Sequence, residues 1–293
     1  MESGWLQLAT AVLAGCGVGF LSGLFGVGGG FLIVPVLKSV LGIPIEFAVG
    51  VGACQVLGPA TTSLLARRVN LSQLRLPLIL LGGLSVGVFS GVSVLEFAKH
   101  QGEVSLWGRP LLMADLVVLA VYFAILLSVA IFSLWDTRRN PINRIFTKGW
   151  IAGWKIPPYV RLIDFDYSRI SIIVLSWFGL AIGFLSGLLG MSGGLVLLPG
   201  FIYLLGMKTH QAVRNTLVIV WLVAVQSTVI HALNDNISLP LVMSLLFGGT
   251  IGARLGSELS QKMVGGQLRK GFGWLLIGAA CLVGYELFAI FAG

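Results

Sequence analysis

The fold of this chain is limited most by a series of long apolar stretches. A helix rises 1.5 Å per residue, so about 20 apolar residues cross the ~30 Å hydrocarbon core of a bilayer. Eight stretches are long enough to predict transmembrane helices. Their ranges are 5–26, 47–66, 76–97, 111–135, 170–190, 212–233, 239–259 and 271–292. The sequence therefore predicts an all-α polytopic membrane protein.

The small number of charged residues supports this class and excludes several others. Charged residues make up 10% of the chain, against ~25% in a soluble domain. The net charge of +8 does not indicate nucleic-acid binding, because no cluster of five or more basic residues occurs. The three cysteines are far apart in apolar stretches and match no disulfide or metal-ligand spacing. We therefore predict no metal and no cofactor.

Two further apolar stretches, 31–41 and 195–205, have eleven residues each, which as helix reach roughly 16 Å, or half a bilayer. Each follows a glycine-rich cluster. Glycine permits a positive φ and close approach of a ligand, and irregular backbone at membrane depth survives only within protein or around a cavity. The sequence therefore predicts two breaks, each followed by a half-length helix. The residues of these breaks are Gly26, Gly28, Gly29 and Gly30 in the first, and Gly190, Ser192, Gly193 and Gly194 in the second.

The two breaks belong to an internal repeat with an offset of 164 residues. At this offset 19–49 aligns with 183–213 without a gap, and 14 of the 31 positions are identical. The segment GFLSGLFGVGGGFLIVP matches GFLSGLLGMSGGLVLLP. A later glycine series around Gly83 resembles one around Gly248, and there we expect the glycines to serve close helix packing. We predict a first membrane repeat at 1–135, a linker at 136–169 and a second membrane repeat at 170–293.

The distribution of Lys and Arg predicts the orientation. If each half-length helix folds back on the helix before it, the loops 67–75, 136–169, 206–214 and 260–270 share one side and hold 15 of the 19 basic residues. By the positive-inside rule this side is cytoplasmic, so both termini lie outside. The linker mixes basic and aromatic residues, which is typical of an amphipathic segment at the cytoplasmic headgroups. The repeats then have inverted topology, a common architecture of secondary transporters.

The half-length helices suggest where a ligand binds. A helix N-terminus has unpaired N–H groups and a partial positive charge. Two such ends brought together would form an anion site near the middle of the membrane. The alternative is that the glycines of the breaks only allow close helix packing.

Polar side chains inside the spans are further candidates. Arg214 is the leading ionisable one, because a guanidinium pairs with an oxyanion through two hydrogen bonds. The alternative is that its side chain extends to the headgroups. Amides and hydroxyls can replace part of the hydration shell of an anion, or they can bond helix to helix. The candidates of this kind are Gln55, Ser192, Asn215, Thr216 and Gln226. No catalytic motif occurs, so an enzyme is not expected.

The doubled glycine motif, each copy followed by a helix that starts near Ala48 or Ala212, resembles the sulfite exporter TauE/SafE family, also called the toluenesulfonate uptake permeases. The resemblance covers most of the chain outside 136–169. It implies a transporter of the cell inner membrane for small sulfur-containing or organic anions, with the glycine motifs as the transport site. Family repeats usually continue as A-V-G-T-S, whereas this chain has Gly50-Val51-Gly52 and Arg214-Asn215-Thr216 after the Ala-Val pair.

We therefore predict a secondary transporter, an exporter or permease, that moves a small anion such as sulfite, a sulfonate or a related organic acid by alternating access. The alternative is a non-transporting accessory subunit of a larger membrane complex. The expected partners are a small anionic substrate and the lipid bilayer, with a protein partner or a homo-oligomer left open. No nucleic-acid partner is expected.

Overall fold

A computed structural model describes residues 2–67, 75–100, 103–106, 109–139, 156–161 and 169–292. Within these residues eight helices are long and apolar enough to cross a membrane, which confirms the predicted all-α membrane fold. Two shorter apolar helices, Gly30–Ser39 and Gly194–Leu204, occupy the positions predicted for half-length helices. Most of the linker 136–169 lies outside the described residues, so its amphipathic character stays a prediction.

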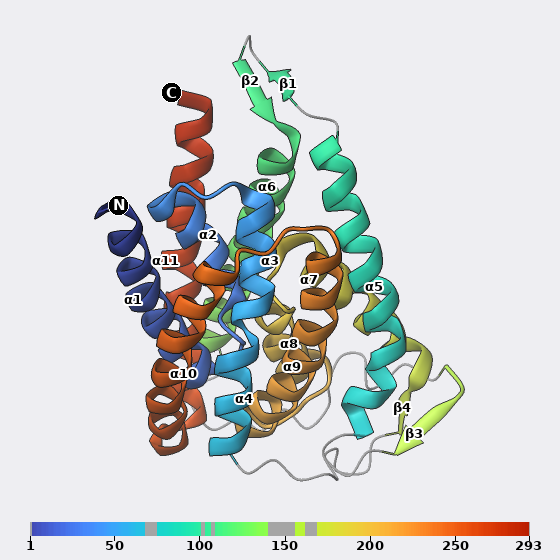
Figure 1. Ribbon diagram of the computed structural model, residues 1–293. Coiled ribbons are helices and arrows are strands. Elements are labelled where there is room, and N and C mark those ends of the chain that lie inside the picture. The colour runs from blue at the N-terminus through green and yellow to red at the C-terminus, as the bar shows by residue number, and fades with distance from the viewer. Residues whose placement is uncertain are drawn as a thin grey trace.

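The elements alternate between long helices and short connections (Figure 1). Their bounds are α1 Glu2–Phe25, α2 Gly30–Leu41, α3 Ile45–Gln55, α4 Leu57–Ala66, α5 Arg75–His100, β1 Glu103–Leu106, β2 Arg109–Leu112, α6 Met113–Arg139, β3 Tyr159–Arg161, β4 Arg169–Ser171, α7 Ile172–Leu189, α8 Gly194–Pro199, the π-helix η2 Gly200–Leu204, α9 Thr209–Leu233, α10 Leu239–Lys262 and α11 Gly265–Ala292. The strands form two antiparallel hairpins, β1–β2 and β3–β4.

Both chain ends lie at one end of the molecule, near the β1–β2 hairpin, and the β3–β4 hairpin lies at the opposite end (Figure 1). Helix α1 starts at the end with the termini, and α2 returns toward it after the glycine break. Helix α7 starts at the β3–β4 end. The hairpin of α1 and α2 is therefore as predicted. The two-fold inversion of the repeats, their boundaries and the side that faces the cytoplasm stay predictions.

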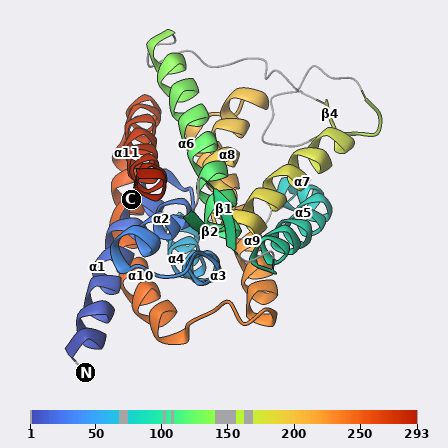
Figure 2. The same ribbon diagram turned by 90° about the horizontal axis from the view of Figure 1, so that it is seen from above.

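Three helix pairs each join a helix of the first half to one of the second half. They are α1 with α10, α5 with α7 and α6 with α11, and Figure 2 shows them from above. Glycines make the first two pairs close. A Cβ placed on Gly19 of α1 would lie 2.2 Å from the carbonyl oxygen of Gly249, and one on Gly183 of α7 would lie 2.2 Å from that of Leu84. The series that includes Gly83, Gly87 and Gly91 on α5 and its counterpart on α10 make the same close contacts. The packing role expected for these glycines is confirmed, except at Gly82, which has no neighbour within 4 Å.

Two helices depart from the predicted ranges at prolines. The predicted span 47–66 is divided at Val56 into α3 and α4. Pro59 has no N–H to give to the carbonyl of Gln55, so the helical ladder is interrupted there. The half-length helix after Gly193 is α-helical only as far as Pro199. It then continues as the π-helix η2. Both interruptions lie in the segments that adjoin the glycine breaks.

Candidate functional site

Each glycine break turns through left-handed backbone. Gly26, Gly28 and Gly29 have φ of 71°, 86° and 74°, and Gly190 and Gly193 have φ of 66° and 68°. L residues rarely adopt this region, which explains the choice of glycine. Helices α2 and α8 then start without any side-chain cap. Their first N–H groups therefore lack a side-chain acceptor.

One residue of the second break departs from this choice. Ser192 stands where the first break has Gly28, 164 residues earlier, and it has a φ of 54° although it carries a side chain. Strain of this kind persists where the surroundings hold it in place and is concentrated at functional sites. The Ser192 side chain is fully buried.

The two breaks lie against each other in the interior of the protein. A Cβ on Gly30 would lie 2.7 Å from the carbonyl oxygen of Gly190. A Cβ on Gly194 would lie 1.9 Å from the carbonyl oxygen of Val27. Helix α2 therefore begins beside the second break, and α8 begins beside the first. The structure brings together the eight residues that the sequence assigns to the breaks.

A tyrosine that the sequence analysis did not single out ties the breaks together. The Tyr122 hydroxyl of α6 donates to the carbonyl oxygen of Leu189 at 3.0 Å and lies 3.4 Å from that of Gly30. Its side chain is 1% exposed. A hydroxyl in the middle of an apolar span was the available signal, because a buried tyrosine hydroxyl usually has a partner.

Helix α9 runs past both breaks. Val213 lies 2.4 Å from the Cβ position of Gly26, and Val220 lies 2.3 Å from that of Gly28. Thr216 is three residues after Val213 and four before Val220, so it shares their face and points toward the breaks. Asn215 is its neighbour, and both side chains are buried.

Several polar atoms in this region have no hydrogen-bond partner among the described residues. They are the hydroxyl oxygens of Ser22, Ser192 and Thr216 and the Asn215 Oδ1. Both amide atoms of Gln55, farther away at the end of α3, also lack a partner among the described residues. An unsatisfied buried polar group costs about 1–3 kcal/mol. Ser22 adjoins Gly29, since its Cβ is 3.1 Å from the Cβ position there. Unsatisfied groups of this kind beside two uncapped helix ends are what a polar ligand or ordered water would satisfy.

The remaining predicted residues lie farther from the breaks. Gln55 ends α3, and its Nε2 approaches the Cβ position of Gly249 on α10 at 2.9 Å. Gln226 is ten residues after Thr216 on α9, roughly 15 Å along the axis, so the structure does not bring it to the breaks. Arg214 lies near the start of α9 and is partly buried.

A second arginine, Arg67, accompanies Arg214 at the end of the molecule where α4 ends and α9 begins. Its Nη2 donates to the carbonyl oxygen of Gly23 at 2.9 Å, and its Nε is buried without a partner among the described residues. Burial and the nearby charge of Arg214 lower the pKa of Arg67 to about 10, so the guanidinium is charged at neutral pH. The sequence analysis counted Arg67 only as a basic loop residue.

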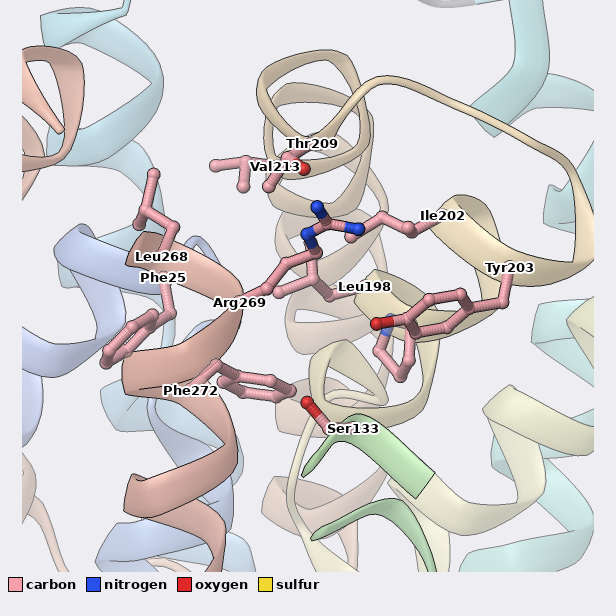
Figure 3. Close-up of a pocket in the computed structure, with 11 residues that line it drawn as sticks. Phe25, Ser133, Leu198, Ile202, Tyr203, Thr209, Val213, Leu268, Arg269 and Phe272 are labelled. Atoms are coloured by element: carbon pink, nitrogen blue, oxygen red, sulfur yellow. The ribbon is translucent and has the colours of Figure 1, made fainter. Parts of the chain in front are cut away.

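A narrow crevice adjoins the first break at this end (Figure 3). Phe25, Leu198 and Val213 line it together with Arg269 and Phe272, whose side chains face it from α11. Its volume of about 10 Å³ is room for about one water molecule. The breaks themselves are closely packed, because the Cβ positions of Gly30 and Gly194 lie within 2.7 Å of backbone oxygens of the other break, so a ligand between them would need the helices to separate. Across the described ranges, no three His, Cys, Asp or Glu side chains are grouped to hold a metal ion.

Comparison with known proteins agrees with the membrane fold. The model of the family described as Sulfite exporter TauE/SafE matches residues 11–283. The chain is 25% identical to the probable membrane transporter protein MJ0441 of Methanocaldococcus jannaschii, over 90% of each chain. It is 27% identical to the probable membrane transporter protein YjnA of Bacillus subtilis, over 86% of this chain and 89% of that protein. No solved structure matches.

Proposed function

This chain belongs to the sulfite exporter TauE/SafE family, a family of membrane transporters, and on that basis we propose that it carries a small oxyanion, such as sulfite or a sulfonate, across the cell inner membrane. One observation supports the anion most directly. Two helix N-termini without side-chain caps meet beside buried polar atoms that have no hydrogen-bond partner in the described part of the chain. Such ends favour negative charge.

In this proposal the oxyanion binds between the two breaks. The N–H groups that open α2 and α8 donate to it, and the hydroxyls of Ser192 and Thr216 complete its shell. A hydrogen bond to a charged group contributes about 1.5–3 kcal/mol, so a few such contacts can replace the hydration of the anion. Arg214 and Arg67 give positive potential at one end of the path and attract the anion.

The close packing of the breaks also supports movement by alternating access. Helices α1 and α10 form one packed pair and α5 and α7 another, with the breaks between them. Rocking of one pair against the other would open the site to one side at a time, as in other transporters built from repeats. We propose both termini outside and the linker 136–169 in the cytoplasm.

The test is uptake of labelled sulfite, ethanesulfonate and sulfoacetate by liposomes that contain the purified protein. We expect saturable flux of at least one of these anions above that of protein-free liposomes. Flux of all three at the protein-free level would refute the proposal.

The site itself is tested with Thr216→Val, which keeps the shape and removes the hydroxyl. The lost contact should raise KM about tenfold, since 1.4 kcal/mol is a factor of ten. Thr250→Val is the matched control, because the Thr250 hydroxyl donates only to Phe247 of its own helix. An unchanged KM in Thr216→Val would remove this residue from the site, and an unchanged KM and flux in Arg214→Ala would do the same for Arg214.

A further inference from the structure

A buried histidine near the other end of α9 has no role in the site proposed above. His231 is fully buried, and neither ring nitrogen has a hydrogen-bond partner among the described residues. Its ring lies beside the backbone of Gly187 on α7. Ser227, one turn earlier on the same face of α9, and Ser186, next to Gly187, are also fully buried, and neither hydroxyl has a partner within the described ranges. This end of the helix therefore holds a group of unsatisfied polar side chains.

The corresponding place in the first half is satisfied in part, because Ser22, the counterpart of Ser186, and the Arg67 Nε also lack a partner among the described residues. Arg67 precedes His231 by 164 residues, the offset that also relates Gly23 to Gly187 and Ser63 to Ser227. Arg67 donates to the Gly23 carbonyl, as described above. The Ser63 hydroxyl pairs with Ser257 at 2.9 Å.

The two halves thus place a permanent cation near one end of the protein and a titratable imidazole near the other. An imidazole can bind and release a proton, whereas a guanidinium does not lose one. The sequence repeat therefore places a proton acceptor where its counterpart has a fixed charge.

The charged groups around His231 come mainly from α5. Glu96 lies within electrostatic range of the ring. The Glu96 carboxylate also accepts from Asn236 Nδ2 at 2.5 Å and lies 3.7 Å from Lys99 Nζ. These contacts hold the carboxylate at the end of α9, because the backbone N–H of Asn236 donates to the backbone carbonyl oxygen of His231 at 3.0 Å.

The other neighbours contribute little charge. Helix α7 has no ionisable side chain, and α3 has only Glu46 at its start and the Cys54 thiol, which reaches Thr228. Asp235 follows α9 and is exposed. Glu96 is therefore the group placed to balance a positive charge on His231.

We propose that His231 is the proton-binding residue that couples anion movement to a pH difference across the membrane. This inference rests on the proposed function. A protonated ring carries two N–H donors, so it can donate to the Gly187 carbonyl as Arg67 does to Gly23, with its charge balanced by Glu96. Protonation then closes this end between α7 and α9, and loss of the proton releases it. The proton crosses with the anion.

The experiment compares accumulation with exchange in liposomes that contain the full chain. Ethanesulfonate is the probe, because it is a strong acid and carries no proton itself near neutral pH. The membrane potential is held at zero with potassium and valinomycin. With one proton per anion, a difference of one pH unit gives about tenfold accumulation on the alkaline side, and a trapped pH dye should record the proton flux.

We expect His231→Gln to exchange ethanesulfonate at equal pH on both sides but to lose the tenfold accumulation. His231→Arg, with a permanent charge, should behave in the same way. The matched control is His100→Gln, an exposed histidine that ends α5 at the same end of the molecule, and it should accumulate as the wild type does.

Wild-type accumulation by His231→Gln, or wild-type transport without proton flux, would overturn the coupling role. Loss of exchange in both His231 variants would place the residue in the anion path and overturn it as well. A wild-type protein that exchanges none of the anions at equal pH would instead refute the transport function, and the coupling role with it.

Discussion

The close packing of α1 on α10 can be tested by comparing alanine substitutions at two glycines of α1. A Cβ on Gly19 would lie 2.2 Å from the carbonyl oxygen of Gly249, whereas ordinary contact begins near 3.4 Å. Gly19→Ala therefore forces the helices apart by roughly 1 Å. A Cβ placed on Gly15 or Gly23, which lie on the same face of α1, would also be under 3 Å from a backbone oxygen of α10. The contacts of these two glycines with α10 therefore loosen too when the helices separate. Overpacking of this kind costs about 1–3 kcal/mol, and we expect the upper part of that range.

Gly17→Ala is the matched control, because Gly17 lies two residues away on α1 and a Cβ there meets nothing within 4 Å. Alanine in a helix is favoured over glycine by about 0.5–1 kcal/mol, so this variant should gain stability slightly. The assay is thermal unfolding in detergent followed by tryptophan fluorescence. At roughly 2–4 °C per kcal/mol, a loss of about 2–3 kcal/mol means that Gly19→Ala should lower Tm by about 4–12 °C. A Tm for Gly19→Ala equal to or above that of Gly17→Ala would refute the packing argument.

Further substitutions test contacts between helices that are far apart in the chain. Tyr122→Phe removes the hydroxyl that bridges the breaks and should cost about 1–2 kcal/mol; an unchanged Tm would show that the bridge does not stabilise the fold. Lys38 pairs with Asp115 at 2.6 Å, with side chains 20% and 16% exposed, so Lys38→Met should cost about 1–2 kcal/mol, less than a fully buried pair. Adding Asp115→Asn should cost less than the sum of the single changes, and additive losses in this double-mutant cycle would contradict the pairing. Ser257→Ala leaves the Ser63 hydroxyl without its partner and should cost about 1 kcal/mol. The measurement is a fall in Tm, and an unchanged Tm would contradict a stabilising role for this hydrogen bond.

The glycine breaks show how much of the structure can be predicted from local sequence. Gly26, Gly29 and Gly193 are predictable because glycine alone adopts positive φ readily, and the apolar stretches after them set the lengths of the half-length helices. The division of a span at Val56 was less accessible, although Pro59 three residues later gave the signal. The predicted site residues also separate in space, since Thr216 faces the breaks and Gln226 does not.

Contacts between distant segments were not accessible in this way. Nothing local to Tyr122 indicates that its hydroxyl bridges Gly30 and Leu189, and nothing local to Arg67 indicates the Gly23 carbonyl. Such partners depend on how helices far apart in the chain pack together. The 164-residue offset does relate Arg67 to His231, but only the contacts show that Arg67 donates to a carbonyl while the His231 ring nitrogens have no hydrogen-bond partner among the described residues.

The amino-acid sequence by itself determines the number of spans, the two breaks and the family of this protein, because hydropathy, helical rise and backbone freedom are properties of short segments. Only the tertiary structure decides that the two breaks meet and that α1 packs on α10 and α7 on α5. It alone also shows that the polar groups beside His231 have no partners among the residues that the structure describes. The physical reason is that each of these depends on the close approach of helices that are far apart in the chain, which the absence of a Cβ permits but does not direct.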